Sequence, residues 1–387
     1  MRFSRRILAF AASGAAILPL SMRAQGTPQS TAVFDDASER INELLQYVPD
    51  GTLVEDSTVT WNDFERNADV VLENAGAAAE SLPADQLAMM SLFAIGPEFI
   101  SRAMQLPEGA GFAMGEILQS LEFGVPLDMG LLVKLNRPAE SLVPFWESMD
   151  YQERENEYGT FWTIGEEGVI DIKNPINRLF LARMNNVAIL SDNTLAYANK
   201  SSLLGEIQAT AAGDAPNRIS TLEPVAAGFP NNATNAWFVG SELFMYEALI
   251  GASLFSVEAA QAIESDFQES NDTIGSMPVL RSACVGVTAG GHRNEDLHDP
   301  TAREFLILET MASGEAEQAA AVIEWRTANQ NSLLTGEPYG DLLSGIEIDV
   351  LVDDLLRCSV PLEIGASKFA TMIMSRDILP FAFRFGE

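Results

Sequence analysis

The chain has 387 residues, of which 47% are hydrophobic and 20% are charged. This hydrophobic content is enough to build buried cores and excludes a wholly disordered chain. The formal net charge is −32, so the composition disfavours binding to nucleic acids and to anionic lipid surfaces, both of which require basic patches. We therefore expect no nucleic-acid partner.

The first 24 residues are predicted to be a bacterial export signal. Three arginines within the first six residues precede an uncharged, mostly apolar run at 7–21, and Ala24 is a small residue suited to cleavage. The run is too short to anchor the chain in a bilayer, and no later run approaches membrane-spanning length. SRRIL resembles a twin-arginine signal and Arg23 suits that route, but the usual aromatic-plus-basic continuation is missing, which leaves the general route open. We expect a periplasmic or extracellular protein that has no integral membrane span after signal cleavage.

Residues 25–213 are predicted to alternate helices and strands. Residues 25–52 contain a polar linker and then a helix, because apolar residues at 41–48 follow helical spacing. Residues 53–213 form a first half. It contains a strand and a capped helix (TVTWNDFERNADVVLENAG), two helical stretches (82–106 and 113–123), a strand with a helix (130–149), and a strand pair with a helix (185–213).

The second half repeats this order at an offset of about 160 to 180 residues. A linker at 214–233, which contains a helical turn or more, leads into residues 234–387. A strand with a capped helix (235–253), a strand with a helix (304–326), and a strand pair with a helix (345–375) then follow. Because identities between the halves are few, this is a duplication of architecture. We expect an α+β fold of two structurally similar halves, each a mostly antiparallel sheet with helices packed on one face.

Short phrases along the chain resemble those of a known family. They are LLQYVPDG, TWNDF, FGVPLDMG, EYGTFWTIGEEGVIDIKNP and NNVAILSDNTLAYAN, and they cover most of residues 40–380. The family resembled consists of exported bacterial proteins, often lipid-anchored, that are built from two such α+β halves. This chain differs from the lipid-anchored members because no cysteine follows the apolar run of the signal. The family has no established activity, so the resemblance implies location and fold but no chemistry.

Both histidines of the chain lie in AGGHRNEDLHD, residues 289–299. They are six residues apart, whereas two metal ligands on one face of a helix need a spacing of three or four. Glycines and Pro300 bracket the segment, and apolar strand-like runs flank it, so we interpret it as a solvated polar loop. The alternative is a divalent-metal site of a hydrolase, formed by His292, Glu295, Asp296, His298 and Asp299. We predict no other cofactor.

The only two cysteines, Cys284 and Cys358, lie in strand-like runs of the second half. An exported chain with two cysteines favours one disulfide. A bridge across the 73 intervening residues would stabilise the fold by about 4 kcal/mol in the chain-entropy model. We therefore predict a structural disulfide between them.

Other catalytic patterns do not occur in the sequence. There is no G-x-S-x-G, no S-x-x-K, no Walker loop and no G-x-G-x-x-G. The five tryptophans could stack on carbohydrate, but large aromatic residues are mostly buried, and we predict that they pack in the core. We predict a non-enzymatic role in binding an unidentified ligand or an envelope component. The alternatives are the metal-dependent hydrolase and an extracytoplasmic solute-binding protein, although no doubly wound parallel pattern supports the latter.

Overall fold

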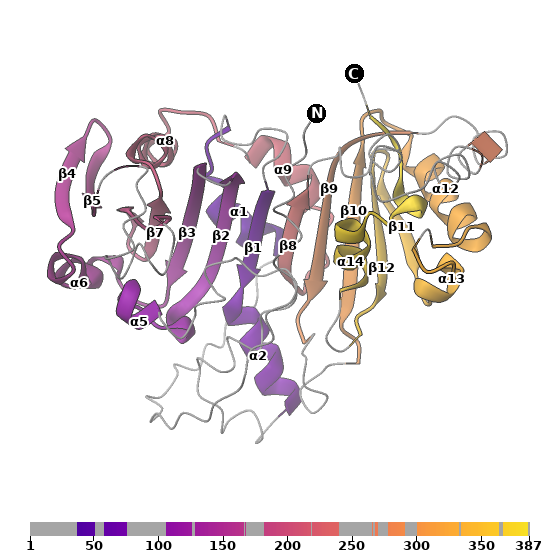
Figure 1. Cartoon of the computed structure of the whole chain (residues 1–387), viewed down its shortest axis with the longest axis horizontal. Helices are drawn as coiled ribbons and strands as arrows, with labels where there is room; N and C mark the ends of the chain where they lie inside the picture. Colours follow the sequence, from indigo (N-terminus) through magenta and orange to yellow (C-terminus); the bar gives the residue numbers. More distant parts are fainter. Residues whose placement is uncertain are drawn as a thin grey trace. The chain divides into compact units, whose positions relative to one another are not determined.

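The computed structural model of the chain describes residues 37–50, 58–75, 106–125, 128–165, 167, 182–217, 219–239, 265, 268–269, 278–290, 300–332, 334–363 and 367–385. All of these belong to one unit, residues 32–387. The residues form an α+β fold in which helices pack on a large sheet (Figure 1).

Twelve strands follow one another across the sheet, and each pairs antiparallel with its neighbours. A thirteenth, β13 (Arg384–Phe385), pairs parallel with β9. In spatial order the twelve are β11 (Glu347–Val352), β12 (Leu355–Pro361), β10 (Arg303–Thr310), β9 (Val279–Thr288), β8 (Ala233–Val239), β1 (Thr58–Asp63), β2 (Ile117–Val125), β3 (Asp128–Leu135), β7 (Thr194–Ala198), β6 (Asn186–Ser191), β5 (Gly159–Thr163) and β4 (Gln152–Asn156).

The strands predicted for the two halves join into this one sheet rather than forming two sheets. The junction is the antiparallel pair β1–β8, where Val59 lies opposite Phe238 and Trp61 lies opposite Ala236. Two separate sheets would leave the backbone groups of β1 and β8 exposed on their edges, and the junction pairs these groups instead. Strands from residues 53–213 and from 234–387 are therefore neighbours at the centre of the sheet (Figure 1).

Helices pack against both faces of the sheet, so the prediction of helices on one face was wrong. On β10, Phe305 and Ile307 belong to one core, and Leu306 and Leu308 belong to a core on the opposite face. Because the strand is apolar on both sides, each side needs a cover. The first core includes residues of α1 (Ala37–Leu45), α8 (Ser201–Ala212) and α9 (Ile219–Ala226), and the second includes residues of α12 (Ala316–Asn329), α13 (Tyr339–Leu342) and α14 (Lys368–Ser375).

A third core lies on the same face as the α12 core, at the β4 end of the sheet. Leu131 and Val133 of β3 point into it, whereas Leu132 between them belongs to the core of α1 and α8. Residues from α5 (Leu106–Gly109), α6 (Val143–Ser148), and the 3₁₀ turns η4 (Met114–Glu116) and η5 (Ala139–Leu142) complete it. The remaining elements are α2 (Phe64–Ala75), which follows β1 directly, and the turn η8 (Leu379–Phe381).

The stretch 113–123, which was predicted to be helical, is mostly strand. Only η4 is helical, and β2 begins at Ile117. Leu, Gln and Glu favour helices by local propensity, but β2 pairs with β1 on one side and with β3 on the other. The ladder hydrogen bonds and burial in the middle of the sheet outweigh the local preference.

Several local predictions are confirmed. The strand pairs predicted within 185–213 and 345–375 are β6–β7 and β11–β12, and the helices α8 and α14 follow them as predicted. The hydroxyl of Ser367 caps α14 by accepting a hydrogen bond from the amide of Ala370 at 3.0 Å. Within the described residues, no helix is long and apolar enough to span a bilayer.

Candidate functional site

The predicted metal ligands, His292, Glu295, Asp296, His298 and Asp299, lie outside the described residues. Gly290, at the start of that segment, donates its amide hydrogen to Oδ1 of Asn67 in α2 at 3.2 Å. The end of β9 therefore lies beside α2. In the described part of the chain, no three His, Cys, Asp or Glu residues are grouped closely enough to hold a metal ion. The metal site stays a prediction.

The predicted disulfide is absent, because Cys284 and Cys358 are both free and buried. Cys284 is on β9 and Cys358 is on β12, with β10 between these strands. Two strand spacings separate them by about 10 Å, whereas bridged cysteines have Cα atoms about 4.4–6.8 Å apart. The two thiols also belong to cores on opposite faces of the sheet. Burial raises the pKa of both thiols, so neither is activated as a nucleophile.

Asp63, at the end of β1, is a buried carboxylate with a structural role. It caps α2 by accepting the amide hydrogen of Arg66 at 3.0 Å, and it forms a two-pronged ion pair with Arg40 of α1. Burial raises the pKa of Asp63, and the charge of Arg40 opposes this effect. Burial also lowers the pKa of Arg40, but the carboxylates of Asp63 and Glu65 outweigh it and hold that pKa above its ordinary value. This cluster ties α1 to the start of α2.

Glu304, at the start of β10, is a second buried carboxylate that caps a helix. Its oxygens accept hydrogen bonds from the N-terminus of α14, with the donors being the Ser367 hydroxyl and the amides of Lys368, Phe369 and Ala370. Burial raises the pKa of Glu304 to about 7, although these hydrogen bonds act in the opposite direction. Asp63 accepts hydrogen bonds from the charged side chain of Arg40, whereas Glu304 accepts them from a hydroxyl and from backbone amides. Its role is to fasten α14 to the sheet.

A row of buried polar side chains crosses the junction between β8, β1 and β2. Asn235, Asn62 and Ser120 are cross-strand neighbours, and Asn235 donates a hydrogen bond from its amide to Oδ1 of Asn62. The Nδ2 atom of Asn62 and the Oγ atom of Ser120 are buried without a partner among the described residues. Each such group costs about 1–3 kcal/mol. These two unsatisfied groups lie at the centre of the sheet.

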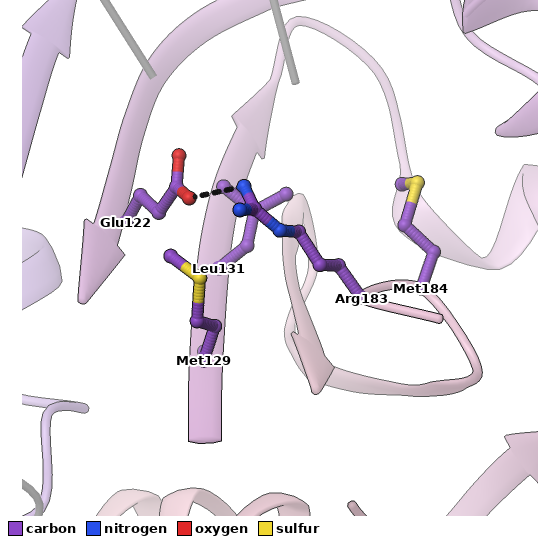
Figure 2. A pocket seen from close by; sticks show the side chains of 6 residues that line it. Glu122, Met129, Leu131, Arg183 and Met184 are labelled. Carbon is purple, nitrogen blue, oxygen red and sulfur yellow. Dashed lines mark hydrogen bonds and ion pairs between the residues drawn. The ribbon is translucent and has the colours of Figure 1, made fainter. Parts of the chain in front are cut away.

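A small pocket lies beside this row. Two residues beyond Ser120 on β2, the Glu122 carboxylate forms an ion pair with Arg183 at 2.8 Å (Figure 2). The lining is completed by Met129, Gly130, Leu131 and Met184. The volume is about 10 Å³, which is room for about one water molecule, whereas ligand pockets are usually about 300 Å³ or more. The pocket is thus too small to bind a metabolite in this conformation.

The edge strand β4 is protected by its sequence, QEREN. Glu153, Arg154 and Glu155 are exposed, and because side chains alternate along a strand, they put charge on both faces of β4. Charges on both faces of an edge strand oppose pairing with another chain, because an added strand would bring its side chains beside them. This edge is poorly suited to docking.

The edge strand β11 differs, because its exposed side chains separate by type between the two faces. Glu347 and Asp349 lie opposite Ser359 and Arg357, on the face of α9. Ile348 and Val350, which lie opposite Cys358 and Leu356, point to the face of α12, where Val350 is 41% exposed. The register shifts after Val350, so that Val352, which is 57% exposed, lies opposite Leu355 at the end of the strand. Exposed apolar side chains on a strand that ends the sheet of the described residues are typical of a surface that accepts another strand. We name Glu347–Val352 the β11 edge.

Sequence reasoning predicted the β11 strand but missed that it lies at an edge. The alternation in IEIDVLV indicates a strand with one acidic and one apolar face, but it does not reveal which strands will be neighbours. The Glu122–Arg183 pair was missed because the two residues are 61 positions apart and belong to no motif. The spatial order of the strands is the information that the sequence lacks.

Comparison with known proteins gives little further information. No protein-family model and no curated protein matches the chain. Crystal forms I and III of TP0453 are similar to 86% of this chain and to 96% and 97% of theirs, with 12% sequence identity and a TM-score of 0.36. A likeness with so low a TM-score supports no conclusion about fold or function.

Proposed function

We propose that this is an exported, non-enzymatic protein that binds an extended segment of another polypeptide along the β11 edge. In such binding the main-chain hydrogen bonds of the added strand supply much of the affinity, and alternate side chains supply specificity. The observation that carries the proposal is the exposure of Val350 and Val352 on a terminal strand of the sheet. Apolar exposure at such a position costs free energy that a docked strand recovers.

A different polypeptide is favoured over a second copy of the chain by charge. The chain has a net charge of −32, and its β11 edge presents Glu347 and Asp349. Two copies would bring acidic edges together within an already repulsive field. A partner without this charge avoids the repulsion.

The proposal of export rests on the N-terminal sequence, with its early arginines, apolar run and Ala24. The proposal that the fold is duplicated is supported by the strand order. Outward from the central pair, β1 is followed by β2, β3, β7 and β6, and β8 is followed by β9, β10, β12 and β11. In each series the first three strands follow one another in the chain. The last two strands stand in the reverse of their chain order, so that the later strand of the pair lies closer to the centre of the sheet. Membership of the family of exported two-half proteins is proposed on the same grounds.

The test measures binding of the labelled neutral peptide acetyl-Thr-Gln-Val-Gln-Val-Gln-Thr-amide to the chain without residues 1–24, by fluorescence anisotropy. We expect saturable binding that V350K/V352K weakens at least tenfold, because lysines on an edge strand oppose pairing. The matched control E153K/E155K changes the opposite edge and should leave the affinity unchanged. No saturable binding, or equal losses in both variants, would overturn the proposal.

A further inference from the structure

The side chains of the β11 edge specify the chemistry of the strand that it takes, an inference that rests on the function proposed above. We infer that the partner segment alternates basic and apolar residues, with its basic side chains beside Glu347 and Asp349 and its apolar side chains beside Ile348 and Val350. The juxtaposition of an acidic row and an apolar row on one edge strand carries this inference.

The acidic row stays accessible although both acids have partners within the chain. Glu347 is paired with Arg303 at 3.1 Å, and Asp349 is paired with Arg357 at 3.2 Å. The carboxylate side chains are 64% and 49% exposed, whereas the arginine side chains are only 28% and 23% exposed. In both pairs the acid is the more exposed member and is contacted through one oxygen. It can therefore accept a further cation.

The geometry of a sheet places the partner's side chains within reach of these acids. On one face of paired strands, opposite side chains have Cβ atoms about 4.5–5.5 Å apart, and opposite charges there attract. Because side chains alternate between the faces, basic residues at every second position of the partner all lie on the acidic side. If the partner strand were displaced by one residue, its basic side chains would lie on the apolar face of β11, beside Ile348 and Val350.

The apolar row lies on the other face, where the strand meets α12. Ile348 is partly buried against the core that contains α12, whereas Val350, farther along the strand on the same face, is exposed. Apolar side chains on the partner would extend this core over Val350 and remove it from water. A β-branched residue fits best, because it is favoured on strands.

The charge on the partner also distinguishes it from other occupants. A second copy of the chain carries the same acids and a net charge of −32, and an acidic segment of any protein meets the same repulsion. A basic strand is attracted over a long range and loses that attraction as salt rises. The affinity is therefore expected to depend on ionic strength.

The experiment compares three labelled peptides that share one backbone. They are the neutral peptide above and its counterparts with arginine or with glutamate in place of all three glutamines, each titrated against the chain without residues 1–24. We expect the arginine peptide to bind about tenfold more tightly than the neutral peptide, and the glutamate peptide to bind more weakly than either. The difference should shrink when NaCl is raised from 50 mM to 500 mM.

The variant E347Q/D349N should abolish the preference for arginine, so that the arginine peptide and the neutral peptide bind to it with equal affinity. Both acids are exposed, so the variant should fold, which circular dichroism can confirm. The control E153Q/E155Q makes the same charge change on β4 and should retain the preference. Binding of the three peptides with equal affinity, or a preference that survives E347Q/D349N, would overturn this inference and leave the proposed function standing. Failure of every peptide to bind would overturn both, and concentration-dependent dimers in sedimentation would favour a second copy instead.

Discussion

The two edges of the sheet, β4 and β11, occupy the same structural position but present different surfaces. On β4, Glu153, Arg154 and Glu155 put charge on both faces of the strand. On β11, the acids are confined to one face, and Ile348 and the exposed Val350 occupy the other. The difference shows that position at an edge does not decide whether a strand is open to pairing. The pattern of side chains decides it.

A buried core lies at each end of the sheet, and truncating a residue of either core should have the largest effect on stability. Trp146 is 1% exposed in the core at the β4 end, and its ring centroid lies 5.0 Å from that of Trp162. Trp146→Ala should lower the free energy of unfolding by about 3–5 kcal/mol. Leu356→Ala, at the β11 end, should lower it by about 2–5 kcal/mol, because Leu356 is also fully buried. Urea denaturation measures both losses, and a loss below about 1 kcal/mol at one end would show that end to be loosely packed.

The β11 end should also be the more sensitive to pH. Burial raises the pKa of Glu304 from 4.5 to about 7, so the folded state holds this proton more tightly than the unfolded state does. The resulting stabilisation is fully present below about pH 4.5 and is lost as the pH rises through about 7, a change of about 3 kcal/mol. Urea denaturation of the wild type and of E304Q between pH 4.5 and 8 should give a difference in stability that changes across this window. A difference independent of pH would contradict the assignment, and E347Q, which changes an exposed acid, is the control.

Removal of the charges from β4 should make the two edges alike. In E153V/E155V the edge loses two exposed acids and gains two valines, so the chain should self-associate at least about tenfold more strongly than the wild type. Sedimentation equilibrium over a range of protein concentrations measures this association. An unchanged monomer would mean that something other than these charges protects β4.

The smallest expected effect concerns the cysteines at the β11 end. Because Cys284 and Cys358 belong to cores on opposite faces of the sheet, reduction should change the stability by less than about 0.5 kcal/mol. A disulfide across their 73-residue separation would instead contribute about 4 kcal/mol. Thermal melts with and without dithiothreitol distinguish the two. A large loss on reduction would contradict the register of β9, β10 and β12.

The sequence predicted the local elements better than their arrangement. The turn between β11 and β12 and the cap at Ser367 were predictable, because turn and cap chemistry is local. The strand β2 was missed, because its pairing on both sides outweighs the helical preference of its residues. The predicted disulfide between Cys284 and Cys358 was wrong for a related reason. Strand-like runs do not reveal which strand lies between them or which face each side chain takes.

The candidate site shows the same limit. The histidine segment was visible as a cluster of residue types, but it lies outside the described residues and its role as a metal site stays a prediction. From the sequence, the β11 edge could be predicted only as a strand whose acidic and apolar side chains alternate. That alternation becomes a candidate binding surface only when β11 is known to end the sheet.

Amide hydrogen exchange with and without the arginine peptide shows whether a strand docks on β11. We expect the amides of residues 347–352 to exchange more slowly when the peptide is bound, whereas those of residues 152–156 keep their rates. An added strand protects those edge amides that point outward and donate hydrogen bonds to it. Equal protection at both edges, or binding of the peptide without protection of residues 347–352, would contradict the claim that β11 is the docking edge.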